Sequence, residues 1–182
     1  MPIIRLVRHG DASAGYAEHP DPGLSERGRR QADLVAAELD ATGPAELITS
    51  PMARARETAA PLASRWGVAP RVEPAISEIP SPGLAPTERG PWLQSLMSRT
   101  WNEAPGDVLA WRDGIIEALL ELEVDTIGFS HFVAINAALS VATSSPHPRV
   151  AHLDHCSVTV FDTDGGRLQV LGTGGEADTT VL

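Results

Sequence analysis

The chain has 182 residues, which is enough for one domain with a full hydrophobic core and short of two. Its composition, 42% hydrophobic and 21% charged, is that of a globular protein. The formal net charge of −10 argues against nucleic acid or an anionic membrane as a general partner. It leaves room for a local pocket of positive charge, which arginine would supply because the chain has no lysine.

Cysteine usage and hydropathy bear on the compartment. The single cysteine, Cys156, excludes an internal disulfide and fits a reducing environment. No signal peptide and no apolar run long enough to span a bilayer is recognisable. We therefore expect a cytoplasmic protein.

The first predicted element is a buried strand over Ile3–Val7, a short run rich in branched aliphatic residues. Arg8, His9 and Gly10 follow it directly. Ligands of open α/β sheets bind outside the carboxyl ends of the strands, so a cation and an imidazole at this point are placed for chemistry. The polar segment 11–23, broken by proline and glycine, is expected to form a loop beside that site.

A helix is predicted to follow this loop. Ser25 can cap its N-terminus, and Glu26 places an acidic side chain in the first turn. Gly28 in the same turn costs up to about 1 kcal/mol relative to alanine. A close packing contact would explain why glycine stands there.

A second strand and a second helix come next. Glu46–Thr49 is a short apolar strand, and Ser50 followed by Pro51 is typical of a helix start, with proline at the first helical position. Pro61 should kink or restart this helix, and Gly67 should end it.

Segment 76–90 holds three prolines and two glycines and is expected to stay irregular. The other elements follow from hydrophobic periodicity and turn residues. They are a brief strand within 68–73, helices over 92–97, 107–123 and 132–141, a strand over 124–129, and a hairpin of strands 157–161 and 167–171.

The alternation of strands and helices, ending in a hairpin, predicts an α/β fold. We expect a three-layer α/β/α sandwich with a mostly parallel central sheet. Residues 1–182 form a single domain in this prediction, with 76–101 as a variable rim or lid and 172–182 as a loose tail.

Chemically useful side chains follow four of the predicted strands. His9 follows the first, Arg54 lies in the first helical turn after the second, Glu78 follows the third and His131 the fourth. Because the carboxyl ends of parallel strands share one edge, these residues and Arg8 should converge. Such a set suits phosphoryl transfer: a neutral imidazole attacks phosphorus, arginines hold the oxygens and a carboxylic acid moves the proton. This much fixed positive charge makes a metal unnecessary.

With these residues in this order, the chain resembles the histidine phosphatase superfamily, also called the phosphoglycerate-mutase-like family. The matching motifs occur in family order and cover most of the chain. They are Arg8-His9-Gly10, Leu24-Ser25-Glu26-Arg27-Gly28 with Gln31-Ala32, Ser50-Pro51-Met52-Ala53-Arg54-Ala55 with Thr58-Ala59, Ser130-His131, and Cys156-Ser157-Val158-Thr159.

The resemblance implies a phosphoglycerate-mutase-like fold, no cofactor and no metal. It implies that His9 is the nucleophile that becomes phosphohistidine. It also implies that Arg8, Arg54 and His131 bind the phosphoryl group, and that Glu78 occupies the position of the proton donor.

The sequence departs from the family pattern at three points. Residues 79–83, Ile-Pro-Ser-Pro-Gly, replace the Gly-x-Trp-Glu-Gly type of segment that often follows the acid, and Asp11 is a second candidate for the proton donor beside Glu78. His131 is followed by Phe132 rather than the usual glycine. The loop after Gly10 lacks the Trp-Asn pair of mutases. We therefore expect a pocket unlike that of a standard sugar-phosphate mutase.

Other notable residues have simpler interpretations. His152 and His155 could suggest a metal pair, but no third ligand is evident nearby. Cys156 fits a small buried apolar residue better than a nucleophile, and Arg56 fits the helix surface. The tryptophans recurring at near-helical spacing favour core or lid packing over ligand stacking. These are Trp92, Trp101 and Trp111.

The first hypothesis for function is a metal-independent phosphomonoesterase that acts through phosphohistidine. The alternatives are a phosphoglycerate-mutase-type phosphotransferase and a non-catalytic module that binds a phosphorylated ligand on the same fold. The expected partner is a small phosphorylated substrate or a phosphoprotein, not nucleic acid and not a membrane. The module without catalysis would be favoured if Glu78 points away from the site, and the intact His9 and Arg8 argue against it.

Overall fold

The structure, a computed structural model, describes residues 1–15, 18–81 and 83–175. Within them a six-stranded sheet has the order β3-β2-β4-β1-β5-β6. Its strands are β1 (Ile3–Arg8), β2 (Glu46–Thr49), β3 (Arg71–Val72), β4 (Thr126–Ser130), β5 (Val158–Asp164) and β6 (Arg167–Gly172). The helices are α1 (Glu26–Asp40), α2 (Ala53–Trp66), α3 (Pro86–Met97), α4 (Gly106–Leu120) and α5 (Phe132–Ala142), with 3₁₀ turns at Pro74–Ile76 and Trp101–Glu103. None of the helices described is long and apolar enough to cross a membrane.

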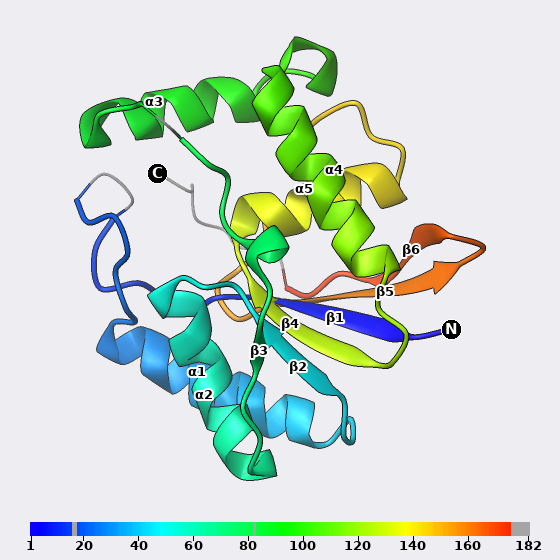
Figure 1. Cartoon of the computed structure of the whole chain (residues 1–182). Coiled ribbons are helices and arrows are strands. Elements are labelled where there is room, and N and C mark those ends of the chain that lie inside the picture. The colour runs from blue at the N-terminus through cyan, green and yellow to red at the C-terminus, as the bar shows by residue number, and fades with distance from the viewer. Residues whose placement is uncertain (16–17, 82, 176–182) are drawn as a thin grey trace.

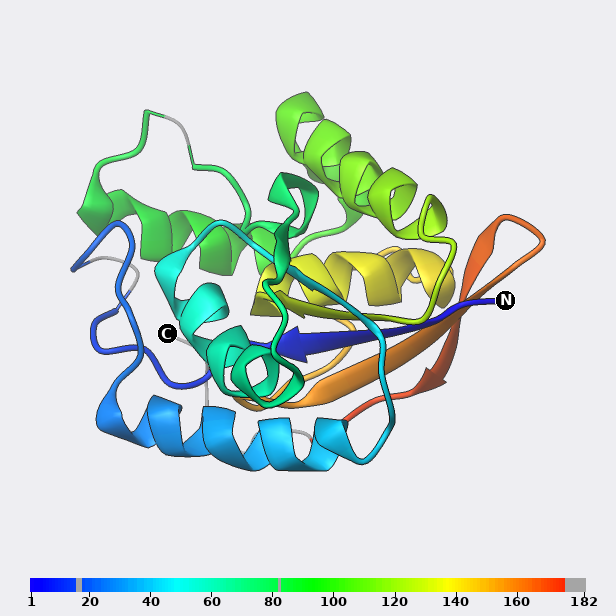
Figure 2. The same ribbon diagram turned by 60° about the horizontal axis from the view of Figure 1, so that its bottom comes forward.

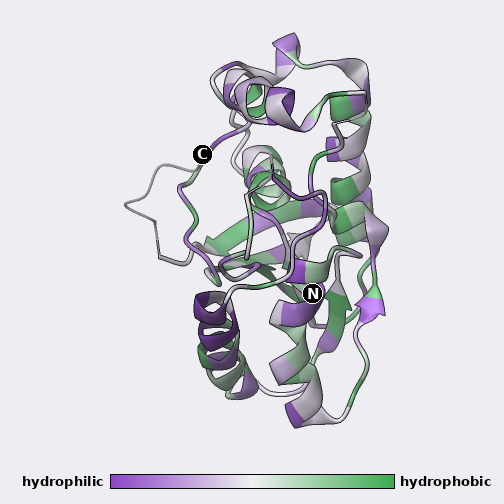
Figure 3. Cartoon of the chain, turned by 90° about the vertical axis from the view of Figure 1, so that its left-hand side faces the viewer, coloured by the Kyte–Doolittle hydropathy of each residue, from purple (hydrophilic) through white to green (hydrophobic). Residues whose placement is uncertain are grey.

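The sheet is the middle of three layers (Figure 1). α1 and α2 cover one face, and α5 with α4 covers the other (Figures 1 and 2). Colouring by hydropathy shows apolar strands between helices that carry polar segments (Figure 3). β1 pairs in parallel with β4, β4 with β2 and β2 with β3, whereas β5 is antiparallel to both β1 and β6. The predicted α/β sandwich with a mostly parallel sheet is confirmed.

Successive side chains along a strand point to opposite faces of the sheet. They contribute to two buried hydrophobic clusters, one on each face. Leu6 and Ile48 belong to the cluster under α4 and α5, while Val7 and Leu47 belong to the cluster over α1 and α2. Gly128 of β4 lies between the side chains of Leu6 and Ile48, and a Cβ there would come within 2.9 Å of Leu6. Glycine at this position therefore leaves room on one face of β4 for the side chains of Leu6 and Ile48.

The start of α1 agrees with the sequence prediction. Ser25 is the N-cap residue, and its Oγ accepts a hydrogen bond from the N–H of Gly28 at 3.0 Å. The close contact inferred for Gly28 is present, because a Cβ at this position would overlap the carbonyl oxygen of Asp11. The first turn of α1 is thus packed directly on the loop that leaves β1.

α2 begins later than the motif Ser50-Pro51 suggests. The N–H of Ser50 donates to the carbonyl of Phe129 at 2.9 Å, which holds Ser50 in line with β2, and the helix starts at Ala53. Pro61 lies inside one continuous helix, since the buried side of α2 packs along its whole length. Gly67 ends the helix with a positive φ of 65°, as expected.

The prediction that 76–90 is irregular throughout is wrong beyond residue 85. α3 already begins at Pro86, whose fixed φ suits the first helical position. The carboxylate of Glu88 accepts a hydrogen bond from the N–H of Ala85 at 2.7 Å and closes the N-terminus. One proline of this segment therefore starts a helix.

The described part of the expected tail is attached to the sheet. Gly172 ends β6, and the carbonyl of Gly175 accepts from the N–H of Asp154 at 3.2 Å. Residues 16 and 17 of the expected loop, residue 82 of the expected rim and residues 176–182 of the expected tail lie outside the described residues.

Candidate active site

The carboxyl ends of the central strands are level with one another. Arg8 at the end of β1 is in register with Ser130 at the end of β4, and Thr49 of β2 is in register with Phe129. The N–H of His9 donates to the carbonyl of Ser130 at 3.0 Å. The residues immediately after β1, β2 and β4 therefore meet at one edge, as the sequence predicted.

His9 has a defined tautomer. Its Nδ1 lies 2.7 Å from the carbonyl oxygen of Gly10, which can only accept, so Nδ1 carries the proton. Nε2 is left with its lone pair and accepts a hydrogen bond from Nε of Arg54 at 3.1 Å. Burial, with the charges of Arg54 and Arg8, holds the pKa of His9 well below its usual 6.5. The ring is neutral, 7% exposed, and presents a nucleophilic nitrogen.

The turn after His9 is hydrogen-bonded to α2 and packed against α1. The N–H of Gly10 donates to Oγ1 of Thr58 at 3.0 Å, and the Thr58 hydroxyl donates to the carbonyl of Arg54 at 2.6 Å. A Cβ at Gly10 would lie 2.7 Å from the carbonyl oxygen of Gly28. The imidazole and the guanidinium are therefore held by the same small network.

Two guanidinium groups flank His9. Arg54, in the first turn of α2, is 4% exposed, and its Nη1 lies 4.0 Å from the carboxylate of Asp21. Arg8 is 7% exposed and stacks over the ring of Phe132, with its central carbon 5.2 Å from the ring centre. Burial lowers the pKa of Arg8 and the charge of Glu78 opposes that shift, and a guanidinium keeps its charge even when buried.

His131, the N-cap residue of α5, lies beside His9 with 5.3 Å between the ring centres. It is fully buried, its Nε2 lies 2.7 Å from Oγ of Ser50, and burial holds its pKa well below the usual value. Within the described residues no group hydrogen-bonds to its Nδ1. The structure thus brings His131 to the predicted place as a neutral ring.

Glu78 belongs to the same cluster although it comes from a different segment. The Ser130 hydroxyl donates to the carbonyl of Ile76 at 2.7 Å, which ties this segment to the end of β4. Burial raises the pKa of the Glu78 carboxyl, against the opposing effects of Arg54, the N–H of Ile79 and Arg8. A carboxyl with a raised pKa near two guanidinium groups is suited to give and take a proton.

Asp11, the alternative proton donor, is used differently. Its carboxylate accepts a hydrogen bond from the hydroxyl of Ser25 at 2.6 Å, and its N–H donates to the side chain of Gln31 at 2.8 Å. These contacts fasten the loop after β1 to α1. The carboxylate of Asp11 is thus engaged by Ser25, whereas the charges of Arg54 and Arg8 act on the Glu78 carboxyl.

His155 is a residue of this cluster that the sequence did not assign. Nη2 of Arg8 lies 3.1 Å from its Nε2, and its ring centre is 6.0 Å from that of His9. The antiparallel approach of β5 to β1 brings it there, because the N–H of Cys156 donates to the carbonyl of Arg8 at 3.0 Å. The only sequence signal available was the motif Cys156-Ser157-Val158-Thr159, which follows His155 directly.

The remaining residues singled out from the sequence lie outside this cluster or at its margin. His152 is exposed, and among the described residues no group of three histidine, cysteine or acidic side chains is arranged to hold a metal ion. Burial raises the pKa of the Cys156 thiol to about 12, which makes it a poor nucleophile. Trp101 is buried and donates to Ser140 at 2.9 Å, and Trp92 and Trp111 pack against the same core.

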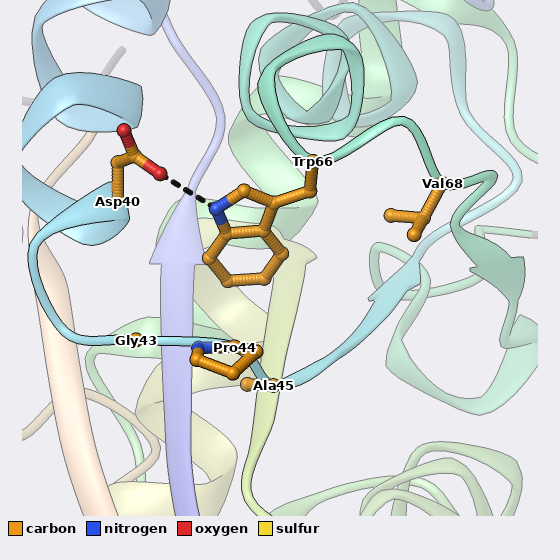
Figure 4. Close-up of a pocket in the computed structure, with 6 residues that line it drawn as sticks. All are labelled: Asp40, Gly43, Pro44, Ala45, Trp66 and Val68. Carbon is orange, nitrogen blue, oxygen red and sulfur yellow. Dashed lines mark hydrogen bonds between the residues drawn. The ribbon is translucent and has the colours of Figure 1, made fainter.

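Two segments outside the sheet lie near the cluster. The loop between β1 and α1 and helix α3 both lie on the side toward which β1 points (Figures 1 and 2). A separate cavity of about 380 Å³, with Asp40 and Trp66 in its wall, lies near the start of β2 at the other edge of the sheet (Figure 4). None of the clustered side chains lines that cavity.

Comparison with known proteins gives a consistent result. The profile of the histidine phosphatase superfamily (branch 1) matches residues 4–174. A PE-PGRS family protein of Mycobacterium tuberculosis is 41% identical over 83 residues, which are 42% of this chain and 14% of that protein. A glucosyl-3-phosphoglycerate phosphatase of the same species is 31% identical over 112 residues, 59% of this chain and 47% of that protein. The chain thus spans less than half the length of these relatives.

A probable phosphoglycerate mutase of Yersinia enterocolitica, GpmB, is 27% identical over 87% of this chain and 84% of its own. Among solved structures, a phosphoserine phosphatase of Entamoeba histolytica in complex with 3-phosphoglyceric acid has a TM-score of 0.76. It is 18% identical, with 96% of this chain and 98% of that chain covered. At this identity the likeness establishes the fold alone.

Proposed function

The chain belongs to the histidine phosphatase superfamily (branch 1), and we propose that it is a metal-independent phosphatase that hydrolyses phosphomonoesters through a phosphohistidine at His9. The observation that carries this proposal is the hydrogen bonding of His9. Nδ1 donates to Gly10, and the lone pair of Nε2 lies beside the guanidinium of Arg54. A nucleophilic nitrogen and fixed positive charge are thereby brought to one point.

In the first step the lone pair of His9 Nε2 attacks phosphorus, and the bond between phosphorus and the ester oxygen breaks. The leaving oxygen takes the proton of the Glu78 carboxyl. A phosphoryl oxygen offers the Nε–H of Arg54 a new acceptor, which frees the lone pair for attack. Arg8, Arg54 and His131 surround the phosphoryl group, and the guanidinium groups balance the charge on its oxygens.

In the second step water attacks the phosphohistidine. The Glu78 carboxylate takes a proton from that water, the bond between phosphorus and Nε2 breaks, and inorganic phosphate leaves. His9 returns to the neutral tautomer that its bond to Gly10 selects. The same carboxyl acts as acid and then as base, for which a raised pKa is suited. Two guanidinium groups supply the charge stabilisation that a metal ion supplies elsewhere.

A non-catalytic binding module is disfavoured, because His9 and Arg8 are both in place and the Glu78 carboxyl is near enough to Arg54 and Arg8 for their charges to act on it. Phosphotransfer of the mutase type remains a second candidate. It is favoured by the similarity to GpmB, which extends over 87% of the chain. The relatives named for phosphatase activity favour hydrolysis.

The substrate class proposed is a small phosphorylated metabolite. His9 and both arginines are at most 7% exposed, so a small ester reaches them more readily than a folded phosphoprotein does. Similar proteins are named for phosphoserine and glucosyl-3-phosphoglycerate. The net charge of −10 disfavours nucleic acid and anionic membranes as general partners.

The test is hydrolysis of an aryl phosphate in the presence of a chelator. We expect phosphate release by the wild type and by a His152→Ala control, and none by His9→Ala. Activity that survives in His9→Ala, or that vanishes with the chelator, contradicts the mechanism. Absence of hydrolysis together with phosphoryl exchange between bisphosphorylated and monophosphorylated substrates would support the mutase alternative.

A further inference from the structure

Arg8 is held from three sides. Its Nη1 donates to the carbonyl of Leu153 at 2.6 Å, and its Nη2 lies 3.1 Å from Nε2 of His155. Phe132 supports the plane of the guanidinium from one face. Leu153 and His155 both belong to the segment that enters β5, so this segment and α5 together fix the direction of the cation.

The contact with His155 also fixes the state of the imidazole. A guanidinium can only donate, so Nε2 of His155 must accept and the ring proton must reside on Nδ1. Burial, with the charge of Arg8, lowers the pKa of His155 from 6.5 to about 4, although Asp11 and Asp154 act in the opposite direction. His155 is therefore neutral near pH 7, and it holds Arg8 without adding charge to the site.

These contacts fix the orientation of the N–H groups of Arg8 that they leave unused. A guanidinium has five N–H groups, of which one on Nη1 and one on Nη2 are used by Leu153 and His155. Nε of Arg8 is buried and has no hydrogen-bond partner within the described part of the chain. The ring centre of His155 lies 6.0 Å from that of His9. The guanidinium that His155 holds, that of Arg8, is therefore close to the proposed nucleophile.

We propose that His155 is a positioning residue of the phosphoryl site, which acts by accepting a hydrogen bond from Arg8 and so orients the unused N–H groups of Arg8 toward the phosphoryl oxygens. The proposal rests on the function proposed above and deepens it. His155 acts on phosphate through Arg8. Its loss should weaken the binding of inorganic phosphate and raise KM, with a smaller effect on kcat.

The first test compares His155→Ala with His155→Gln. The carboxamide oxygen of glutamine reaches about as far as Nε2 of histidine and can accept from Arg8. We expect His155→Ala to raise the dissociation constant of inorganic phosphate, measured by calorimetry, on the order of tenfold, and His155→Gln to restore most of the loss. His152→Ala, an exposed histidine of the same segment, should bind phosphate like the wild type. Equal affinity in His155→Ala and the wild type overturns the proposal.

A double-mutant cycle tests whether the effect passes through Arg8. In an Arg8→Met background, where residue 8 has no N–H group in its side chain, we expect His155→Ala to cause no further loss of phosphate affinity, because the shared hydrogen bond is already gone. Additive losses in the double variant overturn the proposal. Calorimetry with inorganic phosphate requires no turnover, so this result stands apart from the hydrolysis assay. A protein that binds phosphate through this pair yet hydrolyses no ester retains the inference and loses the proposed activity.

A measurement on the unaltered protein covers the case in which His155→Ala does not fold. Nitrogen-15 chemical shifts of the His155 ring near neutral pH should report a neutral imidazole with its proton on Nδ1. The resonances are assigned by their loss in His155→Gln. A proton on Nε2, or a doubly protonated ring, excludes the hydrogen bond from Arg8 and overturns the proposal.

Discussion

Nε of Arg54 donates a hydrogen bond to Nε2 of His9 at 3.1 Å, and Nε2 is the ring nitrogen of His9 that keeps a lone pair. This arrangement has two consequences. Together with burial, the positive charge lowers the pKa of His9 and keeps its ring unprotonated. The same N–H lies where a phosphoryl group bound to Nε2 would place its oxygens.

Replacing Arg54 by lysine keeps the charge but removes the donor at Nε and the planar fork. We expect kcat/KM for an aryl phosphate to fall by about 10² to 10³ fold, the usual loss for one preorganised donor at developing charge. Arg56→Lys is the matched control, because Arg56 lies on the same helix and is exposed. A wild-type rate in Arg54→Lys would show that Arg54 does not contact the reacting group.

Replacing Glu78 by glutamine removes a proton donor and keeps the shape of the side chain. We expect the loss of kcat to depend on the leaving group: about 10² to 10⁴ fold for an alkyl phosphate and much less for an activated aryl phosphate, whose leaving oxygen needs no proton. The measurement is kcat for a series of esters with increasing leaving-group pKa.

Asp11→Asn serves as the comparison for that series. Asp11 accepts from Ser25 and fastens a loop, so its replacement should lower stability without creating a dependence on the leaving group. A steep leaving-group dependence in Asp11→Asn and none in Glu78→Gln would reverse the assignment of the acid.

Acid should destabilise the fold through the buried histidines. The pKa values of His9 and His131 lie well below 6.5 in the folded chain, and that of His155 lies at about 4. Between pH 6.5 and 4 the unfolded chain therefore binds more protons at these rings, and stability falls as the pH is lowered. Glu78 acts in the opposite sense, because its raised pKa favours the folded state in acid, but it is one group against three.

Thermal unfolding between pH 7 and pH 5 tests this balance. We expect Tm to decrease steadily over that interval, and His155→Gln to have a flatter profile because one of the three rings is gone. An unchanged or rising Tm for the wild type on acidification would contradict the neutral state assigned to the histidines.

Close backbone packing predicts a contrast between two glycines. A Cβ at Gly28 would overlap the carbonyl of Asp11, whereas a Cβ at Gly114 in α4 meets nothing within 4 Å. We expect Gly28→Ala to lower the free energy of unfolding by about 1 to 3 kcal/mol and Gly114→Ala to raise it by up to about 1 kcal/mol. Denaturant titration of both variants checks the prediction, and equal stability would argue against the packing of α1 on the loop.

The sequence predicted those parts of the fold that depend on local patterns. The strand before His9 and the helix cap at Ser25 follow from hydrophobic runs and capping residues, and both are confirmed. The starts of α2 and α3 were misplaced, because tertiary contacts decide them. A bond to Phe129 keeps Ser50 in line with β2, and the contact between Ala85 and Glu88 closes α3 around Pro86.

The predicted site residues converge because parallel strands end at one edge, a rule that needs no side-chain detail. This rule does not place His155, because His155 precedes β5, a strand late in the chain that pairs with β1 in the antiparallel direction. Its interpretation rested on spacing relative to His152, a test for metal ligands that says nothing about a contact with Arg8. The order β4-β1-β5 had to be known before His155 could be placed beside the cation.

The proposed mechanism requires that His9 carry the phosphoryl group. The most direct test is to mix the wild type with an ester labelled in its phosphoryl group, stop the reaction within one turnover and map the label. We expect an acid-labile, alkali-stable label on His9 that is absent from His9→Ala and present in the His152→Ala control. Turnover of the ester without label at His9, or label on another residue, would contradict it.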